Sequence, residues 1–475
     1  MSKGGAAMKN KFIATIADAL RQCGLADGMT LSFHHHLRNG DHVVNMTMDA
    51  VASLGIKNIT VACSSLFPVH EHLVQHIRSG VITGIDTDYM SGPLARAITE
   101  GLLPTPVMFR SHGGRPRAIG EGSLKIDIAV IAAPAVDALG NINGTEGPSA
   151  CGSLGYAMPD GRYAAHVIAV TDHLAQGGLG RVSIPHDQVD CVVVVDKIGD
   201  PAGIVSGSIS LTRDPVALAI ARSAQAVIRA SGLLKDGFNY QTGAGGASLA
   251  ASIFLQEDMR AMKLHGGFLL GGITKYMVEM LEEGLFDNVF DVQCFDLSSV
   301  QSIASNPRHV EISADTYANP ASKSACVDYL DAVLLGATEV DLNFNVNVTT
   351  DSNGNIIGGS GGHNDAAAGA KLTIIVAPLV RARLPIVVDK CTTLTTRGET
   401  VDVLVTERGI AVNPARKELA DRLRDARLPV CDIAELHETA MKMTGKPLAF
   451  EHGQKVVGHV EYRDGTIVDK IYAAK

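Results

Sequence analysis

Glycine-rich residues followed by three polar side chains form the most distinctive group in this chain. Residues 358–362 read GGSGG, and residues 363–365 read HND. Because glycine has no Cβ, consecutive backbone N–H groups in such a loop can turn toward one anionic or polarised oxygen. The polar triplet opens an alanine-rich stretch, where a helix N-terminus would also favour negative charge. The pattern indicates an oxyanion cradle, although an isolated glycine cluster is more often a plain turn.

A second glycine-rich loop comes earlier, at residues 243–246, which read GAGG and open onto a helix predicted over 247–256. Its N–H groups would lie at the positive end of the helix dipole, where a phosphate, carboxylate or thioester oxygen can bind. The loop is not a dinucleotide fingerprint, because GxGxxG would need glycine at position 248 and Ser248 is there. A close turn packed under the helix is an equally weighted alternative.

Three histidines and an arginine follow the strand predicted over 29–33, at the end of a strand where ligands of α/β sheets bind. His34, His35, His36 and Arg38 can all receive carboxylates. Since consecutive residues of an extended chain point to opposite sides, the three histidines cannot all face one metal ion. An anion site is favoured over a metal site, and ordinary solvated loop histidines remain the main alternative.

Two further histidines lie one helical turn apart, His72 and His76 in the stretch HEHLVQH. The zinc-protease spacing fails, because position 74 is valine rather than histidine. We therefore predict a plain helix surface here, and no metal site in the chain.

Hydroxyls and a guanidinium follow the strand predicted over 386–388. Thr396 and Arg397 belong to this segment. An arginine near the carboxyl end of a strand can hold a carboxylate through two parallel hydrogen bonds, so Arg397 is a candidate for an acidic substrate.

The elements that must position these residues alternate short β-rich runs with helical segments along the whole chain. Strands that are apolar throughout, such as VVVV at 192–195, indicate burial on both faces of a mainly parallel sheet. Asp214 and Pro215 are start signals for a helix over 216–231, after which the β/α rhythm begins again. We predict an α/β fold with two domains, residues 1–213 and 214–475.

Two segments of the second domain have a more specific pattern. Apolar and polar residues alternate over 341–348, which predicts one strand leading toward the glycine loop. The tail from residue 455 onward predicts a hairpin around Asp464-Gly465.

Composition excludes several classes of function. The chain has 475 residues, a formal net charge of −9 and no basic run, which argues against nucleic acid or an anionic membrane as a partner. No apolar run reaches the ~18 residues that cross a bilayer, and no secretory signal is recognisable. Eight cysteines without a CxxC pair indicate reduced, buried thiols. We expect a soluble, cytoplasmic protein.

Motifs in order along nearly the whole chain resemble the CoA-transferases. GGSGGHND, LTTRGETVDVLVTERGIAV at 394–412 and DLNFNVN upstream are similar to the C-terminal half of enzymes acting on acetate and 4-hydroxybutyrate. HHHLRNGDHVVN at 34–45, GTEGPSACGSLGYAMPDGRYA at 144–164 and FNYQTGAGGASLAASIFLQEDM at 238–259 resemble the branch of citrate lyase alpha subunits. The resemblance implies two tandem CoA-transferase-like (NagB/RpiA-type) domains, each open and mainly parallel.

The activity implied by the resemblance is transfer of a thioester from acetyl to citrate, which gives citryl thioester and acetate. The implied partners are a beta subunit that cleaves citryl thioester, a gamma subunit that is the acyl carrier protein, and further copies of the chain. No tightly bound cofactor is implied in this chain. The donor would be the CoA-derived group of the carrier, or free acetyl-CoA.

One position departs from the pattern of the wider family. Many CoA-transferases attack the thioester with a glutamate in a GIHTEM-like stretch, whereas residues 272–277 here read GITKYM, with Tyr276 in that place. Glu279, Glu282 and Glu283 are near, but their spacing indicates one face of an exposed helix. We therefore expect citrate's own carboxylate to attack the acetyl thioester, forming a mixed anhydride that the released thiolate reopens at the citryl carbonyl.

This hypothesis assigns roles to the candidates above. Glycine N–H groups would stabilise the oxyanion, the polar triplet would orient citrate, and the arginines with a histidine would neutralise its other carboxylates. The catalytic candidates are Gly361, Gly362, His363 and Asn364. The substrate-binding candidates are Gly243, Gly245, Gly246, His34, His35, His36, Arg38, Thr396 and Arg397. A phosphate-binding isomerase or sensor of the same superfold, and a scaffold subunit, are the rival functions.

Overall fold

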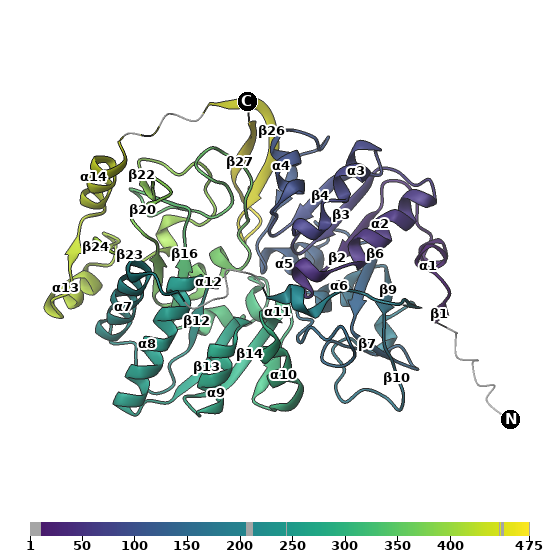
Figure 1. Ribbon diagram of the computed structural model, residues 1–475, viewed down its shortest axis with the longest axis horizontal. Helices are drawn as coiled ribbons and strands as arrows, with labels where there is room; N and C mark the ends of the chain where they lie inside the picture. The colour runs from purple at the N-terminus through teal and green to yellow at the C-terminus, as the bar shows by residue number, and fades with distance from the viewer. Residues whose placement is uncertain (1–10, 206–211, 244, 446, 448–450, 475) are drawn as a thin grey trace.

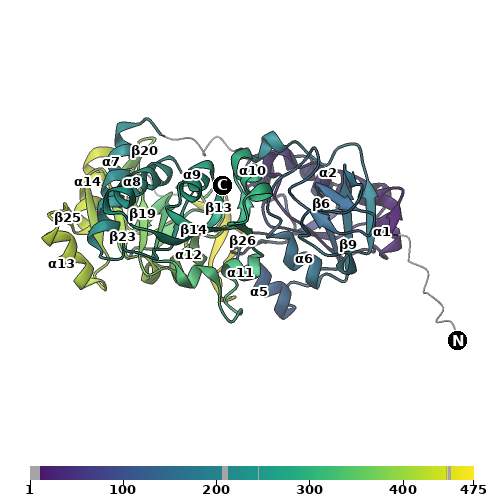
Figure 2. The ribbon, with the colours of Figure 1, turned by 90° about the horizontal axis from the view of Figure 1, so that it is seen from below.

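The computed structural model describes residues 11–205, 212–243, 245–445, 447 and 451–474. Two large, mainly parallel sheets form the centres of two lobes that lie side by side, as Figure 1 shows and Figure 2 confirms from below. We call the lobe with the N-terminal sheet the first unit and the other lobe the second unit. The prediction of an α/β fold with mainly parallel sheets is confirmed.

The sheet of the first unit has ten strands, all paired in parallel except the last two. In spatial order they are β1 (Phe12–Ile13), β11 (Cys191–Val194), β9 (His166–Thr171), β6 (Ile128–Ala133), β2 (Thr30–Phe33), β3 (Ile59–Cys63), β4 (Ile82–Thr87), β5 (Val107–Phe109), β26 (His452–Glu461) and β27 (Ile467–Ala474).

The sheet of the second unit has nine strands, and only β23 and β24 pair antiparallel. In spatial order they are β15 (His309–Glu311), β14 (Phe286–Cys294), β13 (Gly266–Ile273), β12 (Tyr240–Thr242), β16 (Ala332–Gly336), β19 (Thr373–Val376), β23 (Val403–Thr406), β24 (Gly409–Val412) and β25 (Val430–Cys431).

Helices connect these strands. Those of the first unit are α1 (Ile16–Gln22), α2 (Val43–Ser53), α3 (Leu73–Arg78), α4 (Pro93–Thr99), α5 (Gly114–Glu121) and α6 (Ala157–Tyr163). Those of the second are α7 (Pro215–Ala230), α8 (Gly246–Met262), α9 (Lys275–Glu282), α10 (Leu297–Ser305), α11 (Ala314–Ala318), α12 (His363–Gly369), α13 (Lys417–Asp425) and α14 (Ile433–Thr444). The predicted start of α7 is confirmed, because the Asp214 carboxylate accepts hydrogen bonds from the N–H groups of Val216 and Ala217.

The two units repeat one connectivity. The order β9-β6-β2-β3-β4-β5 in the first sheet recurs as β19-β16-β12-β13-β14-β15 in the second, with α2 to α6 and α8 to α12 in equivalent places. Each unit also has a small three-stranded sheet. One contains β7 (Ala135–Asp137), β8 (Ile142–Asn143) and β10 (Leu174–Ala175), and the other contains β17 (Glu339–Asp341), β18 (Val346–Asn347) and β22 (Val387–Val388). A separate hairpin joins β20 (Val380–Arg381) to β21 (Leu384–Pro385).

The C-terminal hairpin crosses between the units. Residues 458–460 of β26 pair in parallel with residues 107–109 of β5, so the hairpin extends the first sheet. The hairpin itself was predicted correctly, and it turns at Gly465, whose φ is +93°. The assignment of all residues from 214 to 475 to the second domain is wrong for residues 452–474. Hydrogen bonds to a strand edge more than 300 residues away decide this placement, and no local pattern encodes them.

The single strand predicted over 341–348 is also wrong. The chain turns back between β17 and β18, and Phe344 has a φ of +64°. The Asp341 carboxylate causes the turn, because it accepts hydrogen bonds from the N–H groups of Asn343 and Asn345 and from the Asn345 side chain. Asp137 and Asn141 make the same turn between β7 and β8, so an Asp-x-x-x-Asn spacing marks equivalent turns in the two units.

Both faces of the second sheet are buried, as its apolar strands predicted. Leu334 and Ile374 belong to one apolar core, while their neighbours Val333 and Ile375 belong to another on the opposite face. The eight cysteines form no disulfide, and only Cys326 and Cys431 are partly exposed. Among the described helices, none is long and apolar enough to cross a membrane.

Candidate active site

A cavity of about 330 Å³ lies between the two units, where the carboxyl ends of both sheets face each other. Both units contribute residues to its lining, because the repeated topology brings equivalent strand ends together. The first unit contributes His35, Arg38, Ser65, Phe67, Tyr89, His112 and Tyr156. The second contributes Gln241, Thr242, Gly243, Gly272, Gln293, Phe295, Tyr317, Leu335, Gly336 and residues 359–363. Among the described residues of this lining there is no aspartate, glutamate, lysine or cysteine.

The glycine loop reaches the cavity by docking onto the first unit. Gly361 donates its N–H to the carbonyl of Asp88 at 3.0 Å and accepts a hydrogen bond from the N–H of His112 at 2.8 Å. A Cβ at Gly359 would lie 2.3 Å from the same Asp88 carbonyl oxygen, so this position must be glycine. Because its N–H is already engaged, Gly361 cannot be the oxyanion donor that the sequence suggested.

Gly362 remains a candidate for the oxyanion donor. Its N–H finds no acceptor among the described residues, and it precedes α12, whose N-terminal end adds a favourable dipole. A Cβ on Gly362 would lie 2.3 Å from the Tyr317 hydroxyl, so no other residue fits without a shift. Gly362 is thus the predicted glycine donor that the geometry retains.

His363 lines the cavity, but both of its ring nitrogens are occupied by the protein. Nδ1 lies 2.7 Å from the Thr396 hydroxyl and Nε2 lies 2.9 Å from the Gly336 carbonyl. A carbonyl only accepts, so Nε2 carries the proton and Nδ1 accepts from Thr396. Burial lowers the pKa of His363 to about 4, which keeps the ring neutral. His363 therefore fixes the start of α12 rather than binding substrate through a nitrogen, and Thr396 acts behind it.

Asn364 does not reach the cavity. It is fully buried, and its amide donates to the carbonyl of Thr395 at 3.4 Å. Its predicted role in orienting citrate is wrong, because the helical turn that brings His363 to the surface of the cavity rotates the next side chain inward.

The three consecutive histidines separate as their alternation predicted. His35 faces the cavity, with Nδ1 2.6 Å from the Ser64 hydroxyl. His34 lies behind it and accepts a hydrogen bond from the N–H of Ala132 at 3.0 Å, and burial lowers its pKa to about 4. His36 is fully buried. Of the three, only His35 remains a substrate-binding candidate.

Arg38 is the single cation in the described lining, and it has no acidic partner there. Its guanidinium lies between two aromatic rings, 5.2 Å from the centre of Phe67 and 4.6 Å from that of Phe295. Nε is buried without an acceptor among the described residues, and burial lowers the pKa of the guanidinium. The backbone is held at a φ of +53°, which is unusual for a residue with a side chain. An unpaired, partly buried cation on a strained turn indicates an anion-binding position.

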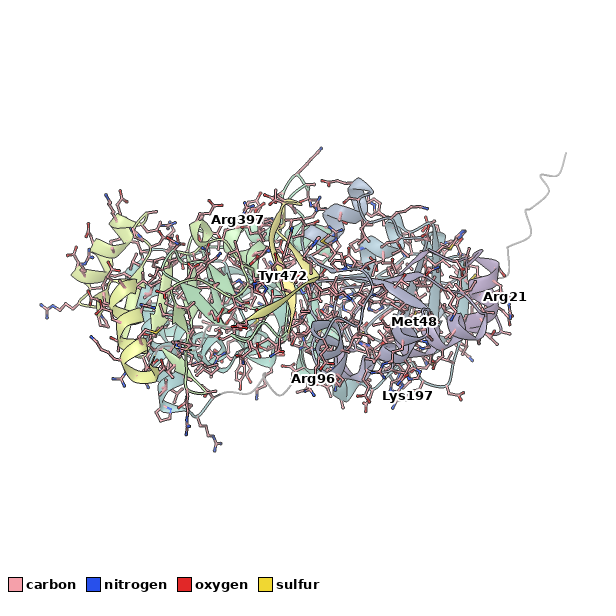
Figure 3. The ribbon with its side chains drawn as sticks, turned by 90° about the horizontal axis from the view of Figure 1, so that it is seen from above. Arg21, Met48, Arg96, Lys197, Arg397 and Tyr472 are labelled. Carbon is pink, nitrogen blue, oxygen red and sulfur yellow. The ribbon has the colours of Figure 1, made fainter. Side chains whose placement is uncertain are left out.

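Other substrate-binding candidates are not in the cavity. Arg397 points to the C-terminal hairpin, where it donates to the Thr466 hydroxyl at 2.7 Å and stacks on Tyr462; Figure 3 labels Arg397 and, on the hairpin, Tyr472. The sequence missed this because the hairpin's position is decided by tertiary contacts. Gly245 and Gly246 start α8 outside the lining, whereas Gly243 is inside but donates its N–H to Leu334 at 2.8 Å.

The structure adds a residue pair that sequence reasoning missed. His112 lies in the lining and its Nδ1 is 2.8 Å from the carboxylate of Asp88, which is fully buried. Burial raises the pKa of Asp88, while its hydrogen bond to His112 opposes that shift. The carboxylate orients the ring, so that Nε2 lies on the side of Gly361. A signal existed in the sequence, since both residues follow short strands, at 82–87 and 107–109.

Comparison with known proteins identifies the family of the chain. Residues 9–474 match the family model of the citrate lyase alpha subunit. The chain belongs to the citrate lyase alpha subunit family. The citrate lyase alpha chain of Escherichia coli (strain K12) is 50% identical over 469 residues, which cover 99% of this chain and 92% of that protein. The alpha chain from Klebsiella pneumoniae is 48% identical over 467 residues, 98% of this chain and 92% of that protein.

Solved structures agree with the fold. A structure described as a citrate lyase alpha subunit in complex with citrate, from Streptococcus mutans, has a TM-score of 0.97 at 47% identity, covering 100% of this chain and 93% of that one. The alpha subunit of a malonate decarboxylase from Acinetobacter baumannii has a TM-score of 0.66 at 16% identity, covering 93% and 96% of the two chains. The second likeness is one of fold alone.

In this member of the citrate lyase alpha subunit family, the helix with the nearest glutamates lies outside the cavity. Tyr276 is in α9, and neither it nor Glu279, Glu282 or Glu283 belongs to the lining. Glu283 pairs with Arg260, whose Nη2 donates to it at 2.6 Å. None of these carboxylates faces the cavity.

Proposed function

We propose that the chain transfers a thioester from acetyl to citrate, giving citryl thioester and acetate. The donor is an acetyl thioester of CoA or of the CoA-derived group on a partner acyl carrier protein. The proposal follows from membership of the citrate lyase alpha subunit family, and from a cavity whose described lining has one unpaired cation and no acid. That unpaired cation, Arg38, is the observation that carries the proposal at this site.

Arg38 fits an anionic substrate because its Nε is buried without an acceptor among the described residues. A buried guanidinium normally pairs with a carboxylate, as Arg115 does with Asp160 at 2.7 Å. Among the described residues, Arg38 contacts the faces of Phe67 and Phe295, which leave its N–H groups for a ligand. A citrate carboxylate placed there would complete the pair, and the rings would shield it from water.

The absence of acids in the described lining supports direct attack by citrate. A citrate carboxylate oxygen bonds to the acetyl carbonyl carbon, and the carbon–sulfur bond breaks to release thiolate. The thiolate then attacks the citryl carbonyl of the mixed anhydride, and the bond from that carbon to the bridging oxygen breaks to release acetate. Protons balance without a base, so the protein needs only to orient the substrates and to stabilise oxyanions.

The donors available for this task are few. Gly362 belongs to the lining and its N–H has no acceptor among the described residues; a fixed donor of this kind is worth ~3–4 kcal/mol in the transition state. His112, oriented by Asp88, is close enough to the loop to contact the thioester sulfur or its carbonyl oxygen. His35, whose ring stacks beside that of His112 at 5.5 Å between centres, would contact a second citrate carboxylate.

The same proposal implies a domain type and partner subunits for the chain. We infer that both units are CoA-transferase-like domains of the NagB/RpiA type, which the repeated strand order supports. We also infer a complex with a lyase beta subunit and the gamma acyl carrier protein in the cytoplasm, with no cofactor held by this chain.

An isotope experiment tests the function and the mechanism together. Enzyme in excess over acetyl-CoA is mixed with citrate labelled with ¹⁸O in its carboxylates, and acetate and citryl-CoA are measured after one turnover. Direct attack puts one citrate oxygen into the first acetate. Unlabelled acetate, with hydroxylamine-sensitive modification of a glutamate, would overturn direct attack while keeping the transferase. No acetate at all, with the isolated chain and with the reconstituted complex, would refute the transferase in favour of a scaffold or an isomerase.

A further inference from the structure

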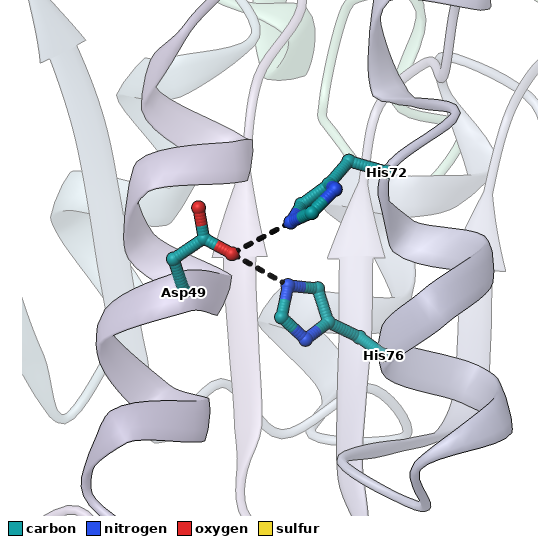
Figure 4. Close-up of side chains that lie close together, drawn as sticks. All are labelled: Asp49, His72 and His76. Carbon is teal, nitrogen blue, oxygen red and sulfur yellow. Dashed lines mark hydrogen bonds and ion pairs between the residues drawn. The ribbon is translucent and has the colours of Figure 1, made fainter.

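Outside the active site, one carboxylate and two imidazoles converge between neighbouring helices. Asp49 on α2 lies 2.8 Å from Nε2 of His72 and 3.0 Å from Nε2 of His76, through the same carboxylate oxygen (Figure 4). His72 immediately precedes α3 and His76 is one turn along it, so both rings point toward α2. Their ring centres are 5.0 Å apart.

The three ligand atoms have the chemistry and spacing of a transition-metal site. They all lie within 4.8 Å of one another, whereas atoms on a tetrahedral zinc ion, at ~2.0–2.1 Å from it, are about 3.3 Å apart. Small side-chain rotations reach that triangle, because Asp49 and His72 are half exposed. Two imidazoles with one carboxylate suit zinc and its neighbours rather than magnesium or calcium.

The surroundings of the three side chains also suit ligation. His76 is largely buried, and its Nε2 is directed at the Asp49 carboxylate. Asp49 is half exposed, which leaves room for a water ligand. Sequence reasoning predicted a plain helix surface because the third ligand, Asp49, comes from another helix.

We propose that Asp49, His72 and His76 bind one zinc-type divalent transition-metal ion, which links α2 to α3. The ion replaces the hydrogen bonds from both histidines to the carboxylate with three metal–ligand bonds. The site is separate from the catalytic cavity, since none of the three residues lines it. Binding stabilises the folded first unit, because the unfolded chain cannot hold the three ligands together.

The test titrates chelator-treated protein with Zn²⁺ in a buffer free of citrate, followed by calorimetry and thermal unfolding. We expect one equivalent to bind and to raise Tm. Asp49→Ala, His72→Ala and His76→Ala each weaken binding more than ~10-fold and remove the rise in Tm. His265→Ala is the matched control, because His265 forms an exposed pair with Asp287 at 2.6 Å and belongs to no such group among the described residues. This variant keeps the binding of the natural chain.

Circular dichroism of each variant shows that it is folded, and Co²⁺ in place of Zn²⁺ reports the ligand type. An absorption spectrum without thiolate charge-transfer bands supports nitrogen and oxygen ligands. Thiolate bands would overturn the proposal, because they would place the ion at a cysteine. Binding that is absent, or equal in the Asp49→Ala and natural chains, would overturn it as well.

Discussion

Replacing Arg38 with methionine separates binding from stability at a single residue. Methionine keeps the length and the apolar stem of the side chain but removes the guanidinium. The left-handed backbone at position 38 is equally unfavourable for both residues, so its strain cancels in the comparison. Any difference between the two proteins therefore reports the charge.

The magnitude follows from what the guanidinium contacts. A hydrogen bond to a charged group contributes about 1.5–3 kcal/mol, so loss of the carboxylate contact raises the Kd for citrate roughly 10- to 100-fold. The stability of the ligand-free protein is not expected to fall, because Arg38 has no acidic partner in the described lining that the substitution would remove. Removing a desolvated, unpaired charge leaves Tm unchanged or raises it.

Arg110→Met is the matched control for this prediction. Arg110 is buried, whereas Arg38 is only partly so, and Nε of Arg110 donates to Asp86 at 2.8 Å while Nη1 donates to Glu461. Breaking such a buried pair costs about 3–5 kcal/mol, so Arg110→Met lowers Tm strongly. Calorimetry with citrate and thermal unfolding measure both effects. A Kd for citrate that is unchanged in Arg38→Met, or a loss of Tm as large as that of Arg110→Met, would refute the reasoning.

Three further outcomes are expected. Gly362→Ala lowers kcat by about 100-fold or more, because the new Cβ meets the Tyr317 hydroxyl and displaces the N–H donor. Adding Tyr317→Phe recovers part of the rate. If it recovers none, the contact with the Tyr317 hydroxyl is not the cause of the loss. His112→Asn and Asp88→Asn each lower kcat about 10- to 100-fold, and the double variant is no worse than either single one; additive losses would separate the two residues. Burial raises the pKa of Asp365 to about 6, so the folded protein holds this proton more tightly and loses stability as pH rises from about 4 through 6. Asp365→Asn escapes this loss and gains up to about 3 kcal/mol relative to the natural chain by pH 7, read from urea-unfolding midpoints; a pH-independent difference would contradict the shift.

Local chemistry explains why much of the fold could be predicted. A few neighbouring residues were enough to predict three features: the apolar strand 373–376, the Asp214 cap of α7 and the glycine loop around Ser360. Alternation along an extended chain predicted that the three histidines cannot all face one point, but only the fold decided that His35 is the one in the lining. Arg38 was found from its position at the end of a strand.

Errors arose where a local preference competed with a nearby side chain or a distant strand. Residues 341–348 have the alternation of a strand, but the Asp341 carboxylate captures two backbone N–H groups and turns the chain. Arg397 was placed at the active site because its strand end suggested it, yet the hairpin that returns to the first sheet provides its partners.

The sequence by itself determined the family, the α/β rhythm and the glycine loop, and it made Arg38 a candidate for anion binding, because each of these depends on residue types a few positions apart. Only the tertiary structure decided that Gly362 rather than Gly361 has an open N–H, that His112 joins the cavity, and that Asp49 meets two histidines. Each of these depends on which backbone or side-chain groups come together across the fold. Each donor or acceptor can form only a few hydrogen bonds. A group that already bonds to another part of the folded protein is therefore not available to bind a ligand.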